Sequence, residues 1–463
     1  SWAISAGSGT TEVAAAATTV ARRARDAVRN DPYAARIVDI WTWNIVGAGV
    51  TTRWPDAPHA DAWRRWSEGG ECDAERQLDF AGLQALAVRA VVESGECFIR
   101  LLPADVTEAN PVGLRMQVLE SDHLDTSRNG VIDGRLTMQG IVLDDAGAPV
   151  GYWLFPRHPG SWWPGLSGSL VSEMIPARDV IHMYRRRRPG QMRDVSWLAP
   201  VLTQLRDLGD YEAAILMKAK IEACLAAVVT EEGDDTLISA DGGLLKDAQG
   251  RPVETFEPGM ILYRRGTGSV DVVNPSGGGS HAAFARRTLE AASVGTGLTY
   301  DQVSGDLTQA NYSSLRAGKI EFRRGCEQIQ YGMVIPMFLR PVAARFHAHG
   351  AMLGLWRGDM PADVTHTPPA QEMIDPLKDT MALIAQVRAG FVPLPEAVGS
   401  FGYDFSKNVG DIVKSNAALD DGGIALDTDP RRVAKSGAAQ DAAQLAAVEL
   451  AAGGATGTGT EGL

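Results

Sequence analysis

The sequence predicts an α+β protein in which a module of helices and antiparallel strands is followed by long helices. Three observations predict this class. Short strand patterns separated by Asp, Asn and Gly turns lie between residues 97 and 184. Apolar residues keep helical spacing across 196–229, which at 1.5 Å per residue is a rod of about 50 Å. A second long helical pattern covers 312–347.

The rod at 196–229 is the feature around which the rest of the chain is organised. Ser196 is placed to cap its first turn, and Pro200 lies early enough to be tolerated there. Its apolar residues draw one stripe along a helix. The stripe consists of Leu198, Val201, Leu202, Leu205, Leu208, Ile215 and Leu216.

Composition limits the classes of function. The chain has 463 residues, of which 45% are hydrophobic and 22% charged, so it can bury large cores. Its net charge is −13 and its pI is about 5.2. Proteins that hold nucleic acid tightly are usually basic, because they neutralise phosphates. An acidic surface lying near DNA would instead leave the DNA mobile.

Cysteine usage and hydropathy bear on the compartment. The four cysteines are far apart and form no CxxC pair, which predicts free thiols in a reducing compartment. No apolar run approaches the length of a membrane span, and we expect no signal peptide. The chain begins with Ser1 rather than methionine, which is compatible with removal of an N-terminal piece.

The N-terminal half reads as an arm followed by the mixed module. Residues 1–15 are small and polar and predict a flexible arm, and 16–195 predict an α+β module. Within the module, Pro32 restarts a helix after Asn30-Asp31. Gly47-Ala48-Gly49 follows a helix rather than a strand, so it predicts a helix end and not a dinucleotide loop. The tryptophans at helical spacing are expected in the core: Trp41, Trp43, Trp63 and Trp66.

The C-terminal half alternates helices with loops. A Gly-rich region with strand patterns at 225–230, 260–264 and 269–273 follows the rod. A helix from Ser280, an irregular stretch from Thr299 to Asn311 and the long helix come next. Strand-like segments lead to three expected helices at 376–389, 395–400 and 404–417, and then to an Ala/Gly-rich tail in which 436–452 could be helical.

Several segments of this chain resemble the lambda family of phage portal proteins. The strongest are the run from Arg188 to Pro200 (RPGQMRDVSWLAP) and the run from Asn311 to Ala317 (NYSSLRA). Weaker ones are 29–50, Cys72-Asp73 followed by Phe80 and Leu83-Gln84, Ser94-Gly95-Glu96, and Asp375-Pro376-Leu377-Lys378. The resemblance covers about residues 16–420, and two long motifs at the correct separation make it specific. Asp194 stands where the family pattern leads us to expect Gly, a departure that concerns a local turn.

The resemblance implies a portal fold divided along the chain. Residues 16–195 would form the wing, joined by a return segment at 348–375. The stem would consist of helices at 196–227 and 280–298, with a small β-rich clip at 228–279 between them. The remaining parts would be a tunnel loop at 299–311, a long helix at 312–347, a helical crown at 376–420 and a flexible tail at 421–463.

The resemblance also implies a function. The family forms a ring, typically of twelve copies, at one capsid vertex, through which double-stranded DNA is packaged and ejected. It implies contacts with the terminase large subunit, the major capsid protein and head-completion or adaptor proteins, and no membrane. It places the chain in the virion and, during assembly, in the host cytoplasm. We expect no enzyme activity, cofactor or metal.

Candidate site residues follow from these assignments. Side chains expected to face DNA from the tunnel loop are Tyr300, Asp301, Gln302, Asp306, Gln309 and Asn311. Those expected on the lumen side of the stem are Asp207, Asp210, Lys218, Arg286 and Arg287, although the two arginines fit contact with a neighbour's Asp207 or Asp210 equally well. Inter-subunit candidates are Arg185, Arg186, Arg187, Arg188, Arg193, Trp162 and Trp163. The arginine run also fits a phosphate patch, with a structural or inter-subunit role favoured because the chain is acidic.

Two other classes of function stay open from the residues alone. One is a metal-dependent hydrolase or nuclease, and the other is an adaptor ring in a phage tail. The sequence holds no P-loop and no GxSxG elbow, and Gly165-Leu166-Ser167-Gly168 is not one. His347 and His349 have no Cys or carboxylate cluster at ligand spacing, so they predict no metal site.

Overall fold

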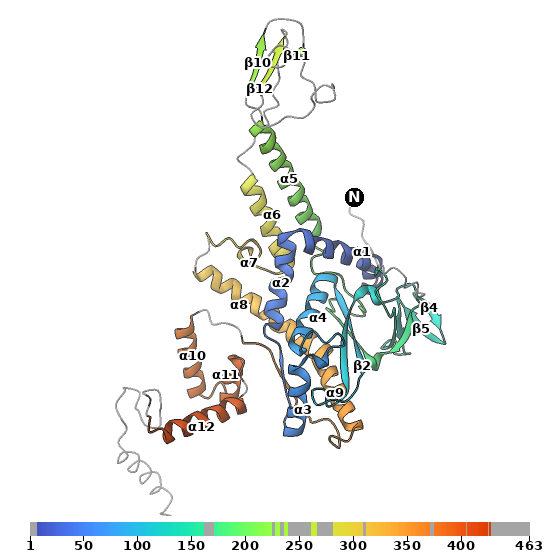
Figure 1. Cartoon of the computed structure of the whole chain (residues 1–463), viewed down its shortest axis with the longest axis vertical. Coiled ribbons are helices and arrows are strands. Elements are labelled where there is room, and N and C mark those ends of the chain that lie inside the picture. The colour runs from blue at the N-terminus through green and yellow to red at the C-terminus, as the bar shows by residue number, and fades with distance from the viewer. Residues whose placement is uncertain are drawn as a thin grey trace, which may run out of the picture. The chain divides into compact units, whose positions relative to one another are not determined.

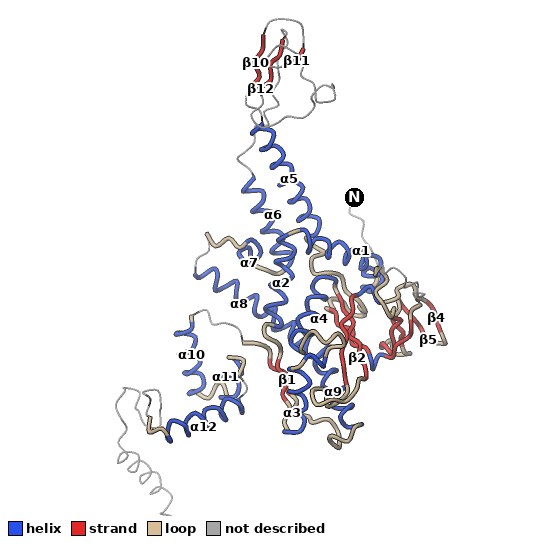
Figure 2. Tube along the Cα trace, viewed as in Figure 1, coloured by secondary structure: helices blue, strands red, loops and turns tan. Residues whose placement is uncertain are grey.

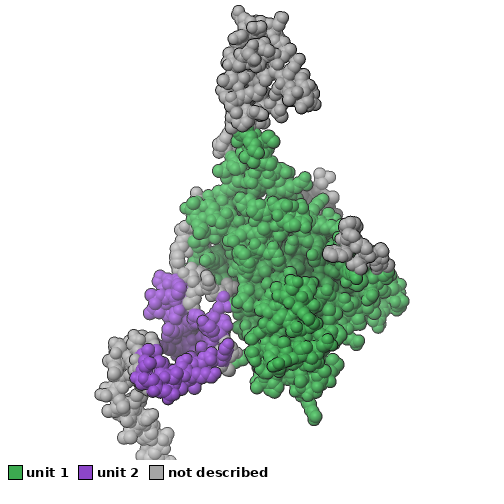
Figure 3. Space-filling view, in the orientation of Figure 1, with its two compact units in different colours: residues 1–369 green, residues 370–463 purple. Residues whose placement is uncertain are grey.

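A computed structural model describes residues 7–161, 171–224, 227–231, 236–238, 261–265, 281–308, 312–370, 375–403, 405–424 and 426. The chain divides into two compact units, residues 1–369 and residues 370–463, coloured separately in Figure 3. Helices and mainly antiparallel sheets confirm the α+β class (Figures 1 and 2). None of the helices described here is long and apolar enough to cross a bilayer.

The first unit begins with four helices, interrupted by one short strand and one 3-10 turn. They are α1 (Gly9–Asn30), α2 (Pro32–Val46), α3 (Ala57–Glu68) and α4 (Phe80–Ser94). Asp31 separates the first two, because its carboxylate accepts the backbone N–H groups of Tyr33 and Ala34 at 2.8 and 2.9 Å. The expected arm at 1–15 is wrong from Gly9 onward. Ser8 caps α1 by accepting the N–H of Thr11 at 3.2 Å.

Two antiparallel sheets form the rest of the segment predicted as the wing, and we keep that name for it. The first has the order β3-β2-β9, from β2 (Glu96–Pro103), β3 (Leu114–Glu120) and β9 (Val180–Tyr184). The second is a meander of β4 (Gly130–Ile132), β5 (Arg135–Met138), β6 (Ile141–Leu143), β7 (Pro149–Leu154) and β8 (Glu173–Pro176). Short 3-10 turns lie at Gly70–Cys72, Ser121–His123 and Ala177–Asp179.

The two faces of β2 belong to two different cores. Successive side chains of a strand point to opposite faces. Cys97 and Ile99 therefore join the large core with the helices, whereas Phe98 joins a smaller core between the sheets. Trp41, Trp63 and Trp66 are buried as predicted, but Trp43 is 56% exposed. The period explains this error, because residues two positions apart lie about 200° apart around a helix.

The segments predicted as the stem contain two helices that pack side by side, α5 (Leu202–Cys224) and α6 (His281–Thr296), and we keep the name stem for this pair (Figure 1). The ring of Tyr211 on α5 lies 4.6 Å from that of Phe284 on α6. The predicted helix start at Ser196 is wrong. Residues 197–201 form turns, and the Ser196 hydroxyl accepts the N–H of Leu198 at 3.1 Å. The predicted end at 229 is also wrong, since β10 (Ala227–Glu231) is already a strand.

The segment predicted as the clip contains a small sheet of order β10-β12-β11, with β11 at Thr236–Ile238 and β12 at Ile261–Arg265. β10 and β12 run parallel, and β11 is antiparallel to β12. These strands agree with the patterns predicted near 225–230 and 260–264. The pattern at 269–273 lies outside the described residues.

The long helix is continuous but changes its winding. It consists of α8 (Tyr312–Ile329), a π-helical segment η4 (Gln330–Leu339) and α9 (Arg340–Met352). Pro336 lies inside the π segment, and a proline cannot donate the usual helical hydrogen bond. The long helix ends at Met352, five residues after the predicted end at His347. Beyond it, β13 (Thr365–Thr367) pairs with β1 (Thr51–Arg53).

The second unit is helical, as expected. It contains α10 (Pro376–Arg388), α11 (Leu394–Ser400) and α12 (Phe405–Asp421). Asp375 caps α10 by accepting the N–H of Lys378 at 3.2 Å, which explains why Asp375-Pro376 begins a helix. The possible helix at 436–452 lies outside the described residues.

Candidate functional site

The root of the stem is where the structure brings two of the quoted motifs together. The motif 188–200 packs against the turn that joins α4 to β2, which contains Ser94-Gly95-Glu96. The backbone N–H of Trp197 donates to the Val92 carbonyl at 3.1 Å. Gly95 has φ of +97°, and a Cβ built on it would lie 2.4 Å from the carbonyl carbon of Val195. Only glycine fits this position without a backbone shift.

A buried ion pair fixes the same junction. The Arg193 Nε donates to Glu96 Oε1 at 2.8 Å, and Arg193 Nη1 donates to the Gln139 side chain at 3.0 Å. His182 Nε2 lies 3.0 Å from the second oxygen of Glu96. All three charged or titratable side chains are almost fully buried. Arg193 is therefore not available to a neighbouring chain, and its prediction as an inter-subunit residue is wrong.

The protonation of this cluster follows from its contacts. Burial alone would raise the pKa of Glu96, but the Arg193 charge and the His182 hydrogen bond outweigh it and lower this pKa to about 2. Burial lowers the pKa of His182, while the charge of Glu96 opposes that change. The cluster thus holds an ionised carboxylate next to a guanidinium inside the protein.

The side chain of Gln191 stabilises the turn within the motif 188–200. Its side-chain oxygen accepts the backbone N–H groups of Arg187 and Arg188 at 2.8 and 2.9 Å. Its side-chain nitrogen donates to the Arg193 carbonyl at 2.7 Å and to Asp194 at 3.1 Å. Burial raises the pKa of Asp194, and the charge of Arg187 opposes that change. The departure at Asp194 therefore supplies a buried acceptor in this turn.

The run Arg185–Arg188 makes contacts within its own chain. Arg185 lies over the Trp197 ring at 5.2 Å, and Arg187 Nε is 3.4 Å from Asp194. Arg186 donates to the Tyr184 hydroxyl at 3.4 Å, and Arg188 pairs with Glu12 on α1. These contacts support a structural role for the run. Because Arg186–Arg188 remain exposed, a contact between subunits stays a prediction.

Of the lumen residues predicted on α5, Asp207 and Asp210 are exposed and Lys218 is half-buried. Asp210 is 3.8 Å from Arg206 on the same helix. On α6, Arg286 lies 3.1 Å from Glu290 and covers the Tyr300 ring at 5.0 Å. Arg287 is mostly exposed and lies 3.6 Å from Glu290. Both arginines thus have an acidic partner on their own helix.

The predicted tunnel loop begins with a short helix, α7 (Tyr300–Ser304), so the expectation of an irregular segment is wrong there. Thr299 and Gln302 form a capping box, with Gln302 accepting the Thr299 N–H at 2.9 Å. The helix packs against α2 and α6, and Val303 is buried.

Beyond the helix, Asp306 is half-buried. Hydrogen bonds from Thr308 lower its pKa. Four of the candidate residues, Gln309, Asn311, Trp162 and Trp163, lie outside the described residues.

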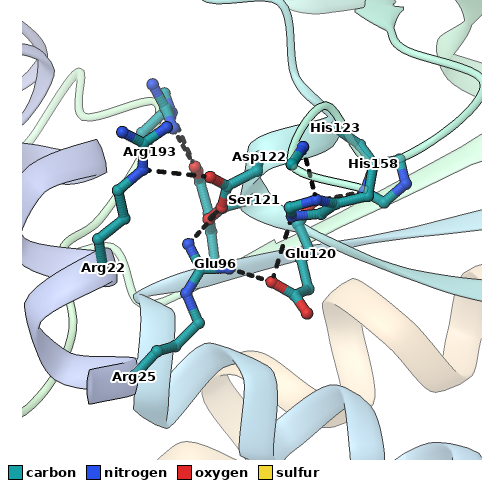
Figure 4. A network of polar contacts seen from close by, with 10 residues as sticks. Arg22, Arg25, Glu96, Glu120, Ser121, Asp122, His123, His158 and Arg193 are labelled. Atoms are coloured by element: carbon teal, nitrogen blue, oxygen red, sulfur yellow. Dashed lines mark hydrogen bonds and ion pairs between the residues drawn. The ribbon is translucent and has the colours of Figure 1, made fainter. Parts of the chain in front are cut away.

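A second polar network joins α1 to the end of β3 (Figure 4). Arg25 pairs with both Glu120 and Asp122, and Arg22 lies 3.7 Å from Asp122. Glu120, Asp122 and His158 offer ligand atoms within 4.8 Å of one another, as a metal site would. Two guanidinium groups already neutralise these carboxylates, so the geometry favours an ion-pair network over a cation site.

Comparison with known proteins identifies the family. The family model "Phage portal protein, lambda family" matches residues 1–330. The chain belongs to the lambda family of phage portal proteins. The members of this family are structural components of phage capsids and not enzymes.

Curated relatives are portal proteins of phages. The chain is 26% identical over 330 residues to the probable portal protein of Halomonas phage phiHAP-1, covering 66% of this chain and 61% of the relative. It is 25% identical to the portal protein of Escherichia phage N15, covering 65% of this chain and 63% of that relative. It is 22% identical to portal protein B of Escherichia phage lambda, covering 65% and 62%. The chain therefore spans about three fifths of the length of these relatives.

Two solved structures are also similar to this chain. One is the virion of a native gene transfer agent particle, with a TM-score of 0.43 and 15% identity. The other is the neck of that particle computed with C12 symmetry, with a TM-score of 0.42 and 16% identity. Each match covers 84% of this chain and 93% of the other.

Sequence reasoning missed most of what holds the stem root of this portal protein together. The buried cluster there is made of residues that are far apart in sequence and form no motif of known spacing, namely Glu96, His182 and Arg193. The capping box at Thr299 and Gln302, by contrast, was readable as a Thr followed three residues later by Gln.

Proposed function

We propose that this chain assembles into a ring at one capsid vertex, typically of twelve copies, that conducts double-stranded DNA during packaging and ejection. The match of the portal family to residues 1–330 carries this proposal, because it covers the segments that we propose as the wing, the stem helices and the tunnel segment. The clip between the stem helices would serve as docking platform for the terminase large subunit and for head-completion or adaptor proteins. The major capsid protein would surround the ring in the virion, after assembly in the host cytoplasm.

The exposed apolar residues of the stem support assembly. Leu205 and Leu208 near the root of α5 are buried, but Leu216 and Met217 are 56% and 58% exposed. Phe284 on α6 is 45% exposed. Adjacent stem helices in a ring would cover these side chains, and their burial would stabilise the ring.

The polar side of the stem supports a sliding contact with DNA. We propose that Asp207, Asp210 and Lys218 face the channel together with the tunnel segment. Mixed and mainly acidic charge cannot clamp phosphates, so the duplex stays mobile. In the tunnel segment, Gln302 is committed to the cap of α7, which leaves Tyr300, Asp301, Asp306, Gln309 and Asn311 as the proposed contacts.

The first test is electron microscopy of the purified chain together with assays for nuclease and hydrolase activity. We expect symmetric rings with a central hole and no turnover. A monomer that cleaves DNA in the presence of a divalent metal would contradict the proposal and favour the hydrolase alternative. A ring that enters tails but not capsids would favour the adaptor alternative.

The second test concerns the tunnel segment. We expect that removing residues 306–310 leaves α7 and the rings intact but lowers the yield of packaged DNA at least tenfold, because the contacts with the moving duplex are lost. DNA protected from nuclease inside particles measures this yield, and rings are counted by electron microscopy. A deletion of similar length in the exposed turn 144–147 between β6 and β7 serves as control. Normal packaging by the tunnel variant would contradict a role of this segment in DNA passage.

A further inference from the structure

Helices α2 and α8 form a pair with an exposed stripe on each outer side. They pack through Trp41 and Phe322, whose ring centroids lie 5.1 Å apart. The side chains of two residues that are two positions apart on a helix point in directions about 200° apart. Trp43 on α2 and Ile320 on α8 therefore point away from this contact in opposite directions, and they are 56% and 40% exposed.

The outer stripe of α2 combines with α4 in a patch of defined composition. Asp39 on α2 pairs with Arg89 on α4, and Gln84 exchanges two hydrogen bonds with the backbone of Val50. These contacts show that α2 and α4 run antiparallel. Trp43, one turn after Asp39, is therefore level with Leu86, about one turn before Arg89. We define the α2 patch as Arg36, Asp39, Trp43, Leu86 and Arg89.

The α2 patch has the composition of a protein interface. Its centre is Trp43 with Leu86, which is 42% exposed. The guanidinium of Arg36 lies 5.5 Å from the Trp43 ring centroid, and its Nε donates to the Gln302 carbonyl at 3.2 Å. The ring is thus held in place before any partner arrives. Exposed tryptophan and arginine surrounded by polar groups are typical of the residues that dominate binding energy.

The outer stripe of α8 and η4 complements this patch. We define the α8 face as Ile320, Arg324, Glu327 and Tyr331, and Tyr331 is 63% exposed. Arg36 has no carboxylate partner and Glu327 has no cationic one within the part of the chain that the structure describes. Each stripe therefore offers an apolar centre with charged residues beside it. The α8 face carries the exposed Arg324 as well as the exposed Glu327, and Glu327 supplies the carboxylate that Arg36 of the α2 patch lacks.

Ring symmetry selects the occupant of the α2 patch. A closed ring of identical chains joins two different surfaces of each chain, head to tail. The α2 patch and the α8 face meet this requirement, because they lie on opposite sides of the α2–α8 pair. DNA fits the patch poorly, since its centre is apolar and the Asp39–Arg89 pair cancels its own charge.

We infer that the α2 patch of one copy binds the α8 face of the next copy in the ring, with Trp43 against Ile320 and Tyr331 and with Arg36 near Glu327. This inference rests on the proposed ring. It assigns a contact at the level of the wing and the long helix, in addition to the contacts of the stem helices.

The test compares oligomer formation of full-length variants by mass photometry. We expect Trp43→Ala to raise the chain concentration needed for half-maximal ring formation at least tenfold. Val131→Ala is the matched control, because Val131 is an apolar residue of β4 that is 75% exposed, and it should leave this concentration unchanged. Since Trp43 is exposed, the monomer of the variant should keep the circular dichroism and thermal unfolding of the wild type.

Charge reversal and crosslinking test the pairing itself. Arg36→Glu and Glu327→Arg should each weaken the ring, and the double variant should recover part of the loss. In the double variant Leu86→Cys and Ile320→Cys, a short bis-maleimide should yield a ladder of covalent oligomers. The native Cys72, Cys97 and Cys326 are buried, and wild-type chain treated in the same way gives the background.

The outcomes separate this inference from the proposed function. If the wild-type chain forms no ring, the proposed function fails. If the wild type forms rings and Trp43→Ala matches Val131→Ala, the inference alone is overturned. It is also overturned if Trp43→Ala assembles normally but fails to enter capsids, because the capsid protein is then the occupant of the patch.

Discussion

Replacing Arg193 by alanine is expected to lower the free energy of unfolding of the wing by about 3–5 kcal/mol. The substitution leaves Glu96 in a site where it is only 1% exposed and has lost its guanidinium partner. A buried, unpaired carboxylate costs far more than the pair itself contributes, because its desolvation is no longer offset. Urea unfolding followed by tryptophan fluorescence at neutral pH measures the loss.

An exposed ion pair supplies the control for Arg193→Ala. Arg206 lies 3.8 Å from Asp210, and both side chains are mostly exposed. Arg206→Ala should therefore change the free energy of unfolding by no more than about 0.5 kcal/mol. Adding Glu96→Gln to Arg193→Ala removes the stranded charge and should restore part of the stability. Equal losses for Arg193→Ala and Arg206→Ala would show that the Glu96 pair is not buried in solution.

The same cluster predicts how stability depends on pH. The pKa of Glu96 is lowered to about 2 in the folded protein, so the unfolded chain takes up a proton at a higher pH than the folded one. This contribution to stability is present above about pH 4.5 and is lost as the pH falls toward 2. His182, whose pKa burial also lowers, adds a loss of the same sign below about pH 6.5. A variant with Glu96→Gln should lose the Glu96 part of this dependence.

Helices and strands were predictable here because they depend on local periodicity. The stem helices, the long helix and the three helices after Asp375 carry apolar residues at helical spacing, with caps such as Asp31 and Asp375. The start of the stem was misplaced because Ser196 and Pro200 resemble a helix start. In the fold, Ser196 instead stabilises a turn and donates to the Val92 carbonyl, a contact that local pattern does not encode.

The candidate site was less predictable because it is made of long-range contacts. Arg193 stands in a basic stretch that reads as surface, yet it pairs with a carboxylate 97 positions away. Trp43 shows the opposite error. Its spacing from Trp41 already excluded a common face, so the sequence held the signal that one of the two tryptophans is exposed.

Gly95→Ala is expected to lower the free energy of unfolding by about 2–5 kcal/mol, from two separate causes. The first is backbone strain, because Gly95 has φ of +97°. The second is a clash, because the new methyl group would lie 2.4 Å from the carbonyl carbon of Val195. The atoms it meets are backbone, so they cannot move aside as a flexible side chain would.

Gly134 separates these two causes experimentally. It has φ of +77° in the turn between β4 and β5, and a Cβ built on it meets nothing within 4 Å. Gly134→Ala should therefore show the strain alone, about 1–2 kcal/mol, and the difference between the two variants measures the close packing at Gly95. That packing joins the wing to the residues that begin the stem. Gly95→Ala, unlike Gly134→Ala, should also speed amide hydrogen exchange at Trp197, whose N–H donates to the Val92 carbonyl. Equal effects of the two variants on stability and exchange would mean that the stem root does not depend on this contact.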